Sequence, residues 1–274
     1  MPIEISTYED KKVFFNHVIH ESTDGLFFEF HTHDICELIL IKTGNACAVI
    51  GERTYRLKKN DLIIFRPAVP HRISFDKGGA YERYNILFNE KKMANQMYER
   101  IPEELDVVNL SGNTYFISLF EKLDYYYEKF DAQDRKILIR NLIEEIVYNI
   151  YLCPIDSLSG RIISAPPIIS AAIEYINEHY TEPITVLDIA KELCVTKSHL
   201  HHLFSESMNI SPKRYVNMKR LSKARGLIRM GERASAIYTS CGFNDYATFF
   251  RNYVKAFGYP PSEENYTIRP EIIS

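Results

Sequence analysis

The sequence predicts an α+β protein of more than one domain, with an antiparallel β-barrel and a helical hairpin at the N-terminal side and an all-α part at the C-terminal side. Three observations lead to this fold class. Short β-branched and aromatic segments fill residues 11–88, helical periodicity replaces them from residue 89 onward, and a helix–turn–helix pattern occurs twice after residue 188. The chain of 274 residues has the length of two average domains.

Seven segments of strand length make up the N-terminal region. Turn-forming residues separate them, as in 42–45 and 76–79. Many short strands at this spacing favour a sandwich or a barrel over a βαβ fold. The expected strands are VFFNHVIH, LFFEFH, CELILI, ACAVI, TYRL, LIIF and YNILF.

A helical hairpin is expected after the strands. Residues 90–100 form a short helical candidate, and two longer amphipathic helices follow, the second beginning after the N-cap candidate Asp131. These helices carry more apolar surface than one barrel can cover, so we expect part of the hairpin to form a homodimer interface. The alternative is that both apolar stripes pack on their own barrel. The stripes are Phe116, Leu119, Phe120, Leu123 and Tyr127, and then Ile137, Leu138, Leu142, Ile146 and Ile150.

The composition excludes fibrous, disordered and membrane-spanning classes. Hydrophobic residues make up 46% and charged residues 25% of the chain, as in soluble globular proteins. No apolar run approaches the ~18 residues of a membrane span, and we expect no secretory signal because the N-terminus lacks a basic and then apolar pattern. Five scattered cysteines without a CxxC pair indicate free thiols and a cytoplasmic protein.

The two ends of the chain differ in charge. Residues 1–170 hold 20 basic and 25 acidic residues, a balance of −5, whereas residues 171–274 hold 13 and 11, a balance of +2. Residues 212–233 alone carry eight basic residues and one acidic residue, Glu232. Such a block indicates either a polyanionic partner or a solvated helix face.

The C-terminal part contains a repeat with a spacing of about 48 residues. Each copy has the pattern of a short helix, a tight turn and a second helix, which is the helix–turn–helix plan. Thr196 and Asn244–Asp245 are N-cap candidates for the second helices, and Pro212 and Gly231 suit the two ends of a linker helix between the copies. The expected core and turn residues are Ile189, Ala190, Leu200, Phe204, Gly242, Phe243 and Phe249.

On these residues, the segment 168–262 resembles the DNA-binding domain of AraC/XylS-type transcriptional regulators. The matching pieces are IEYINEHYTEPITVLDIAKELCVTKSHLHHLFSESMNISPKRYVNMKRLSKARGLI and CGFNDYATFFRNYVKAFGYPPSE. The resemblance implies two helix–turn–helix units that read successive major-groove segments of double-stranded DNA, and RNA polymerase as a further partner. Arg251 suits a guanine, because a guanidinium bonds O6 and N7 together. The residues carried over as base contacts are Lys197, Ser198, His201, His202, Asp245, Tyr246, Ala247 and Arg251.

The chain departs from the family pattern at three places, all in the second unit. Tyr238 stands where a small alanine is usual, and Tyr253–Val254 replaces a usual Phe-Lys pair. After Pro261 the chain continues with Ser262, Glu263 and Glu264, where a Tyr-Arg pair is usual. We therefore expect a weaker contact with DNA from the second unit than from the first.

Two segments of the strand-rich region resemble the metal-binding segments of cupin barrels. Their matching residues are His31, His33, Glu37 and Gly44, followed by Asp61 and His71. The spacing of two between His31 and His33 places both on one face of a strand. The resemblance implies a divalent metal such as Zn, Mn, Fe, Co or Ni. Asn60 in place of a glycine, and Pro67 one residue late, depart from the cupin form. The implied ligands are His31, His33, Glu37 and His71.

The alternative for this region follows from the resemblance to AraC-type regulators, which commonly keep the same general pattern in a barrel that binds a small effector without a metal or other cofactor. Such effectors are often sugars or related metabolites. The residues expected to contact the effector are His31, His33, Glu37, Tyr55, His71 and Tyr84.

Together these features predict a sequence-specific DNA-binding transcriptional regulator, an effector-responsive activator and not an enzyme. The rival from another class is a metal-dependent cupin enzyme whose helical domain serves assembly. A third possibility is a DNA-binding protein whose barrel only dimerises. The expected parts are a cupin-like effector barrel (1–90), a helical dimerisation segment (91–152), a linker (153–167), the DNA-binding domain (168–262) and a tail (263–274).

Overall fold

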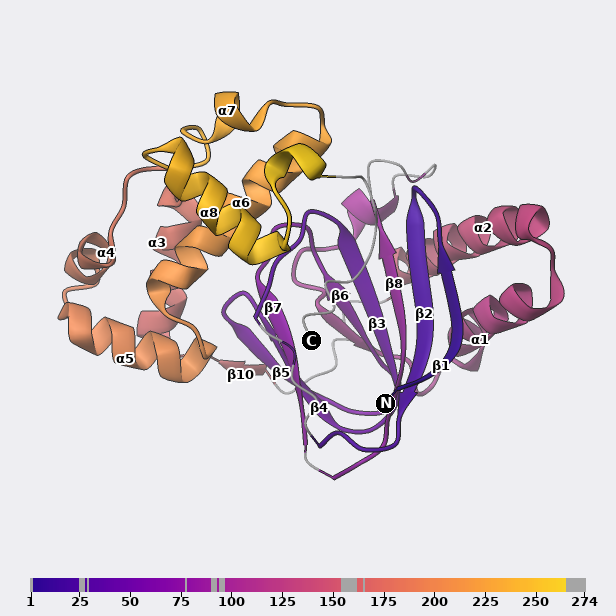
Figure 1. Ribbon diagram of the computed structural model, residues 1–274. Coiled ribbons are helices and arrows are strands. Elements are labelled where there is room, and N and C mark those ends of the chain that lie inside the picture. Colours follow the sequence, from indigo (N-terminus) through magenta and orange to yellow (C-terminus); the bar gives the residue numbers. More distant parts are fainter. Residues whose placement is uncertain are drawn as a thin grey trace.

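The computed structural model describes residues 2–24, 28, 30–76, 78–89, 93, 97–153, 162–164 and 166–264. It shows a β-rich N-terminal domain flanked by a helical hairpin, and a helical C-terminal domain (Figure 1). The α+β fold class is confirmed. Residues 154–161 and 165 of the expected linker, and 265–274 of the expected tail, lie outside the described residues. The domain boundaries stay a prediction.

The strands are β1 (Ile3–Glu9), β2 (Val13–His20), β3 (Cys36–Thr43), β4 (Ala46–Ile50), β5 (Arg53–Leu57), β6 (Asp61–Phe65), β7 (His71–Phe75), β8 (Tyr81–Phe88), β9 (Val107–Asn109) and β10 (Ile162–Ser164). The α-helices are α1 (Thr114–Lys129), α2 (Ala132–Tyr151), α3 (Pro167–His179), α4 (Val186–Glu192), α5 (Lys197–Met208), α6 (Pro212–Arg229), α7 (Ala234–Ile237) and α8 (Tyr246–Phe257). Two short 3-10 helices are η2 (Met97–Arg100) and η4 (Pro261–Glu263).

Two antiparallel sheets face each other in the N-terminal domain. The larger sheet has the strand order β1-β2-β8-β3-β6-β9, and the smaller sheet has the order β10-β5-β4-β7. Neighbouring strands pair antiparallel throughout both described sheets. None of the described strands belongs to both sheets, so this part of the chain forms two facing layers. The predicted antiparallel β domain is confirmed, and its closure into a barrel is not seen among the described strands.

The larger sheet is covered on both faces, which explains its continuous apolar segments. Leu38 and Leu40 of β3 face the core beneath the helical hairpin, whereas Ile39 and Ile41 face the smaller sheet. Side chains alternate along a strand with a period of two, so a strand buried on both faces has no polar positions in its sequence. The smaller sheet, by contrast, alternates buried and partly exposed residues along β5 and β7.

The helical hairpin packs on the larger sheet of its own chain. Asp131 caps α2 as predicted, since its side chain accepts hydrogen bonds from the backbone N–H groups of Gln133 and Asp134. The buried residues of α1 and α2 share one core with the sheet, so most of both stripes packs on the β domain of the same chain, and the homodimer stays a prediction. Ile137, expected in the stripe, is 53% exposed. The buried face of α2 instead runs through Ile139, Leu142, Ile143, Ile146, Val147 and Ile150.

The sequence pattern does not predict β1, β7, β9 or β10. The last two have only three residues each, which is too short for any periodicity to show. In the expected strand LFFEFH, Phe28 and Phe30 lie outside strands and His31 forms only an isolated bridge. In the expected helix 90–100, η2 is the described regular structure, and Met93 has none.

The C-terminal domain has two hydrophobic cores that share α6. Tyr215 and Val216, near the start of α6, pack with α3, α4 and α5. Leu221 and Ala224, one to two turns later, pack with α7 and α8. The two helix–turn–helix units are therefore α4–α5 and α7–α8, and one continuous helix fixes them relative to each other. No helix among the described residues is long and apolar enough to cross a membrane.

A buried histidine joins the sheet to the hairpin. His17 of β2 contacts Asp124 of α1 at 2.9 Å and Glu82 of β8 at 3.0 Å. Asp124 also accepts hydrogen bonds from the hydroxyl groups of Ser6 and Tyr84. Burial lowers the pKa of His17, but the contacts with the two carboxylates outweigh burial, and the net pKa lies above its ordinary value.

The stability of the N-terminal domain should therefore fall as pH rises above about 6.5, the ordinary histidine pKa. A histidine whose pKa is higher in the folded state binds more protons when folded. The contribution of this protonation to the free energy of unfolding is complete below the pKa of the unfolded state. It is lost as pH rises through the pKa of the folded state, by at most about 1.4 kcal/mol per pH unit. Urea unfolding between pH 6 and 8 should show this slope in the wild type and a smaller one in His17→Gln.

Asp124→Asn removes the carboxylate that raises the pKa of His17, so it should flatten the same profile. Equal slopes in the wild type and His17→Gln would show that His17 is not protonated in the folded protein.

Candidate functional site

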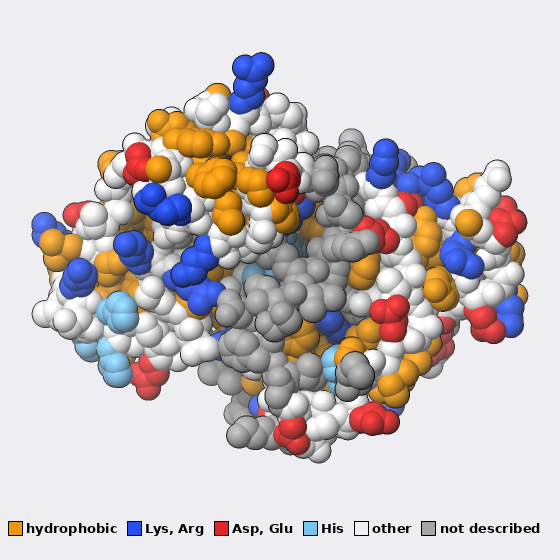
Figure 2. Space-filling model, in the orientation of Figure 1, with side chains coloured by type: hydrophobic (Ala, Val, Ile, Leu, Met, Phe, Trp, Pro, Cys, Tyr) orange, Lys and Arg blue, Asp and Glu red, His pale blue; other side chains and the backbone are white. Residues whose placement is uncertain are grey.

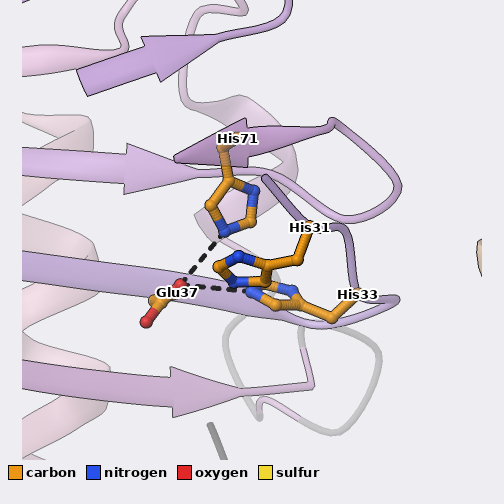
Figure 3. A group of neighbouring side chains, drawn as sticks. All are labelled: His31, His33, Glu37 and His71. Carbon is orange, nitrogen blue, oxygen red and sulfur yellow. Dashed lines mark hydrogen bonds and ion pairs between the residues drawn. The ribbon is translucent and has the colours of Figure 1, made fainter. Parts of the chain in front are cut away.

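Three histidines and one glutamate converge between the two sheets (Figure 3). Glu37 is the second residue of β3, and His71 is the first residue of β7. One ligand atom from each of the four residues lies within 4.8 Å of the others. The sequence identifies this group, but the two histidines do not share a described strand: His31 pairs with His71 through an isolated bridge, and His33 lies outside the strands.

The ring nitrogens of two histidines are oriented by backbone carbonyl groups. Nδ1 of His33 lies 2.8 Å from the oxygen of Ile35, and Nδ1 of His71 lies 2.8 Å from the oxygen of Val69. A carbonyl oxygen only accepts, so both Nδ1 atoms carry the proton. Both Nε2 atoms then face the same oxygen of Glu37, at 3.1 and 3.3 Å.

This geometry places the Nε2 atoms of two imidazoles beside one carboxylate oxygen. Burial disfavours the charged form of Glu37, but hydrogen bonds with His33 and His71 outweigh burial and hold the pKa of Glu37 well below its ordinary value. Burial also lowers the pKa of His71. The close contacts between the Nε2 atoms and the Glu37 oxygen require either a protonated imidazole or a cation bound between the nitrogen and the oxygen. Imidazole and carboxylate together suit divalent transition metals, and Nδ1–H groups held by carbonyls are typical of metal-ligating histidines.

The cavity at the cluster is small. Its volume is about 50 Å³, which accommodates an ion with one or two waters. Asn85 donates a hydrogen bond of 2.8 Å to the second oxygen of Glu37, and sequence reasoning missed this residue. The available signal was an amide inside the apolar strand segment YNILF. The other residues that line the cavity are Phe28, Ile39, Phe65, Ile73 and Arg83.

The structure does not bring Tyr55 and Tyr84 to the cluster. Tyr84 is one residue from Asn85 on β8, so its side chain lies on the opposite face of the sheet, where its hydroxyl donates to Asp124. Tyr55 is buried, and its hydroxyl donates to Asp106 at 2.7 Å. Neither tyrosine lines the cavity between the histidines.

The second helix of each helix–turn–helix unit is capped and follows a tight turn. Thr196 caps α5 and Asp245 caps α8, as predicted, each through a side-chain oxygen that accepts from a backbone N–H of the first turn. Gly242 lies in the turn of the second unit with φ +90°, and a Cβ there would meet Arg220 Nε and the Tyr180 oxygen at 2.7 Å each. Glycine is therefore required at this position.

Two family models match the chain in the order that the structure shows. The AraC-like ligand binding domain matches residues 17–100, and the helix-turn-helix domain matches residues 189–265. Together they cover more than half of the sequence. The chain belongs to the AraC family of transcriptional regulators. The predicted resemblance and the DNA-binding regulator are confirmed.

Relatives of this AraC-type regulator match it along most of both chains. The chain is 28% identical to the lactose operon transcription activator of Staphylococcus xylosus over 82% of each chain. It is 23% identical to the HTH-type transcriptional activator RhaS of Escherichia fergusonii over 87% of each chain. Among solved structures, ToxT of Vibrio cholerae is 15% identical, with coverage of 93% of this chain and 97% of that one and a TM-score of 0.41.

The AraC-type regulator exposes all eight residues that were carried over as base contacts. Figure 2 shows Lys, Arg and His side chains over α4 and α5, whereas hydrophobic side chains gather over α7 and α8. On α8, Tyr246 and Phe250 are among the exposed large hydrophobic residues. Asp245 is used as the helix cap, and Arg251 donates to Thr248 Oγ1 at 3.1 Å. Base reading by these eight residues stays a prediction.

The basic block of the sequence is largely committed to contacts inside the regulator. At least five of its eight cations donate to protein oxygens, so contacts inside the protein engage most of the block. These donors are Lys219, Arg220, Lys223, Arg225 and Arg229.

Two of the departures from the family pattern meet in the fold. The hydroxyl of Tyr253 donates to Glu264 at 2.5 Å, and Tyr259 donates to the same carboxylate oxygen at 3.0 Å. Glu264 also accepts from Arg225 and Arg229. The carboxylate therefore compensates for the hydroxyl that Tyr253 adds to the core of the second unit. The third departure, Tyr238, packs edge-on against Tyr246.

Proposed function

We propose that the chain is a cytoplasmic, sequence-specific transcriptional activator that responds to a small effector and contacts RNA polymerase, and that it performs no catalysis. The observation that carries the proposal is the joint presence, in one chain, of an AraC-like ligand-binding domain with a buried polar cluster and of two helix–turn–helix units on one shared helix. A metal-dependent enzyme would account for the cluster but leaves the paired units unexplained. The printed names of the relatives support activation.

The first experiment measures binding to DNA from upstream of the protein's own gene by fluorescence anisotropy, with shuffled DNA as competitor. Specific binding should exceed non-specific binding by ~10³–10⁷, with a steep salt dependence from released counterions. In Arg251→Ala, preference for the upstream DNA should fall by ~1–3 kcal/mol, because a bidentate base contact is lost.

Lys255→Ala is the matched control, since Lys255 is an exposed cation one turn further along α8. It should weaken binding to both DNAs alike, as loss of a phosphate contact does. Unchanged preference in Arg251→Ala would show that the second unit does not read bases. No binding of the wild type to either DNA at low salt would favour the enzyme.

We further propose that the histidine cluster holds a divalent transition metal, which is either the effector or its anchor. Three observations support this: the donor set of three imidazoles and one carboxylate, the Nε2 atoms turned toward Glu37, and a cavity too small for a sugar. Typical pockets for metabolites measure ~300–1,000 Å³.

Elemental analysis of protein purified without a histidine tag and dialysed after incubation with Zn²⁺, Mn²⁺ or Ni²⁺ tests the metal. About one equivalent should be retained, and less at low pH because imidazoles must be neutral to bind. His71→Asn should lose it, while His20→Asn, which changes a histidine of β2 outside the cluster, should not. Less than about a tenth of an equivalent in the wild type would exclude a metal and leave a metal-free effector.

We infer that the regulator is a homodimer formed through the outer face of α2. Ile137, Tyr148 and Leu152 are 53, 43 and 56% exposed, and their spacing places them on one side of the helix. Exposed apolar side chains that cluster on one helix face are typical of protein–protein contacts.

Leu152→Glu should raise the dimer dissociation constant at least about tenfold, because a charge would enter an apolar interface. Sedimentation equilibrium measures this. Leu187→Glu, the same change at an exposed leucine of α4, should leave the association unchanged. A monomeric wild type would exclude this interface.

A further inference from the structure

One face of α6 lies against the N-terminal domain. Tyr215, Lys219, Gly226 and Arg229 follow one another at i, i+4, i+11 and i+14, which is a single stripe along a helix. The ring of Tyr215 lies 6.2 Å from that of Phe30, and Phe30 belongs to the core of the first helix–turn–helix unit. The linker helix α6 therefore contacts both DNA-binding units and also the segment that leads into the histidine cluster.

The C-terminal end of this stripe forms a buried ion pair between the domains. Nη1 of Arg229 lies 2.7 Å from Oδ1 of Asp34, and the two side chains are 4 and 15% exposed. Nε of Arg229 bonds the fully buried carboxylate of Glu264 at 2.8 Å. Asp34 directly follows His33, a member of the cluster, in the sequence. Glu264 thus orients a guanidinium that reaches from the second unit to the loop of the cluster.

A second contact from the middle of α6 reaches the loop between β6 and β7, which is hydrogen-bonded to His33. Nζ of Lys219 donates to the backbone oxygen of Ala68 at 3.1 Å, and the backbone N–H of Ala68 donates to the oxygen of His33 at 2.7 Å. Ala68 adopts φ +61°, a backbone conformation that is costly for alanine and that persists where surrounding contacts hold it. One polar contact of the stripe therefore ends at Asp34, the residue after His33, and the other ends at Ala68, which is hydrogen-bonded to His33.

We propose that this stripe is a latch, in which Arg229 and Lys219 dock the DNA-binding domain on the cluster loop and transmit occupation of the cluster to DNA affinity. The proposal rests on the proposed function. Ligation of His33 and Glu37 moves the ends of the segment that carries Asp34, and Asp34 holds Arg229. A docked and a released arrangement then differ in their affinity for the cluster's occupant and for DNA, and the two affinities are coupled reciprocally.

The close approach of α6 to the loop allows the latch to be locked reversibly. A Cβ placed on Gly226 would lie 3.6 Å from the Cβ of Asp34, within the 3.5–4.5 Å range typical of disulfides. In Asp34→Cys/Gly226→Cys, oxidation should close a disulfide that holds the domains together. Reduction should release them, because Arg229 has lost its carboxylate partner on the loop.

Two readouts are needed. Hydrogen exchange of α6 and of residues 31–37 should be slow in the wild type and in the oxidised double variant. It should be faster in the reduced variant and in Asp34→Asn. The dissociation constant for the upstream DNA should differ between oxidised and reduced forms by at least about fivefold, the lower end of typical allosteric coupling. Zn²⁺ should change DNA affinity in the wild type and not in the oxidised form.

The controls distinguish an effect of the latch contacts from a general effect on folding or DNA binding. Asp34→Cys alone should not respond to oxidant, and Asp76→Asn, which breaks an ion pair with Arg56 inside the N-terminal domain, should exchange and bind DNA as the wild type does. Equal DNA affinity of the oxidised and reduced forms would overturn the latch, as would wild-type exchange in Asp34→Asn. Absence of DNA preference in the wild type would instead overturn the proposed function, and the coupling with it.

Discussion

Helix α6 contributes residues to the cores of both helix–turn–helix units, and its placement depends on how its partly buried cations are paired. Moving a cation out of water is costly unless oxygens replace the lost hydration. Arg220 obtains them from the backbone oxygens of Tyr180 and Glu182, after the first unit's helix α3. Lys223 obtains one from Ser240, in the turn of the second unit. The charges thereby fix the orientation of both units around one axis.

The same rule governs the cluster in the N-terminal domain. Glu37 lies on β3 beside a run of buried apolar residues, Leu38 to Ile41, and its carboxylate is stable there because two imidazoles and the amide of Asn85 surround it. A sheet buried on both faces can hold a charged carboxylate near the end of a strand only when such polar partners surround it. A polar residue inside a doubly buried strand is therefore informative about function, because packing alone would favour an apolar residue.

Much of the fold follows from periodicity, and the failures have physical causes. The strand VFFNHVIH and the caps Thr196 and Asp131 lie where the sequence predicts them, because alternation and capping are local properties. The spacing of the residues identifies the cluster, although His31 and His33 share no described strand. Tyr55 and Tyr84 were misplaced because the partners of a buried hydroxyl, here Asp106 and Asp124, are distant in sequence. Contacts between domains leave no trace in local patterns.

The departures from the family pattern gain meaning from these distant contacts. Tyr253 and Glu264 read separately as losses of DNA-binding groups, yet together they build the carboxylate site that orients Arg229 toward Asp34. The exposed face of α8 is at the same time rich in aromatic rings. A unit whose cations turn inward has fewer left for phosphates, and affinity for DNA is dominated by such cations. We therefore expect the first unit to contribute most of the affinity for DNA, and the latch proposal assigns control of the second unit's position to the effector domain.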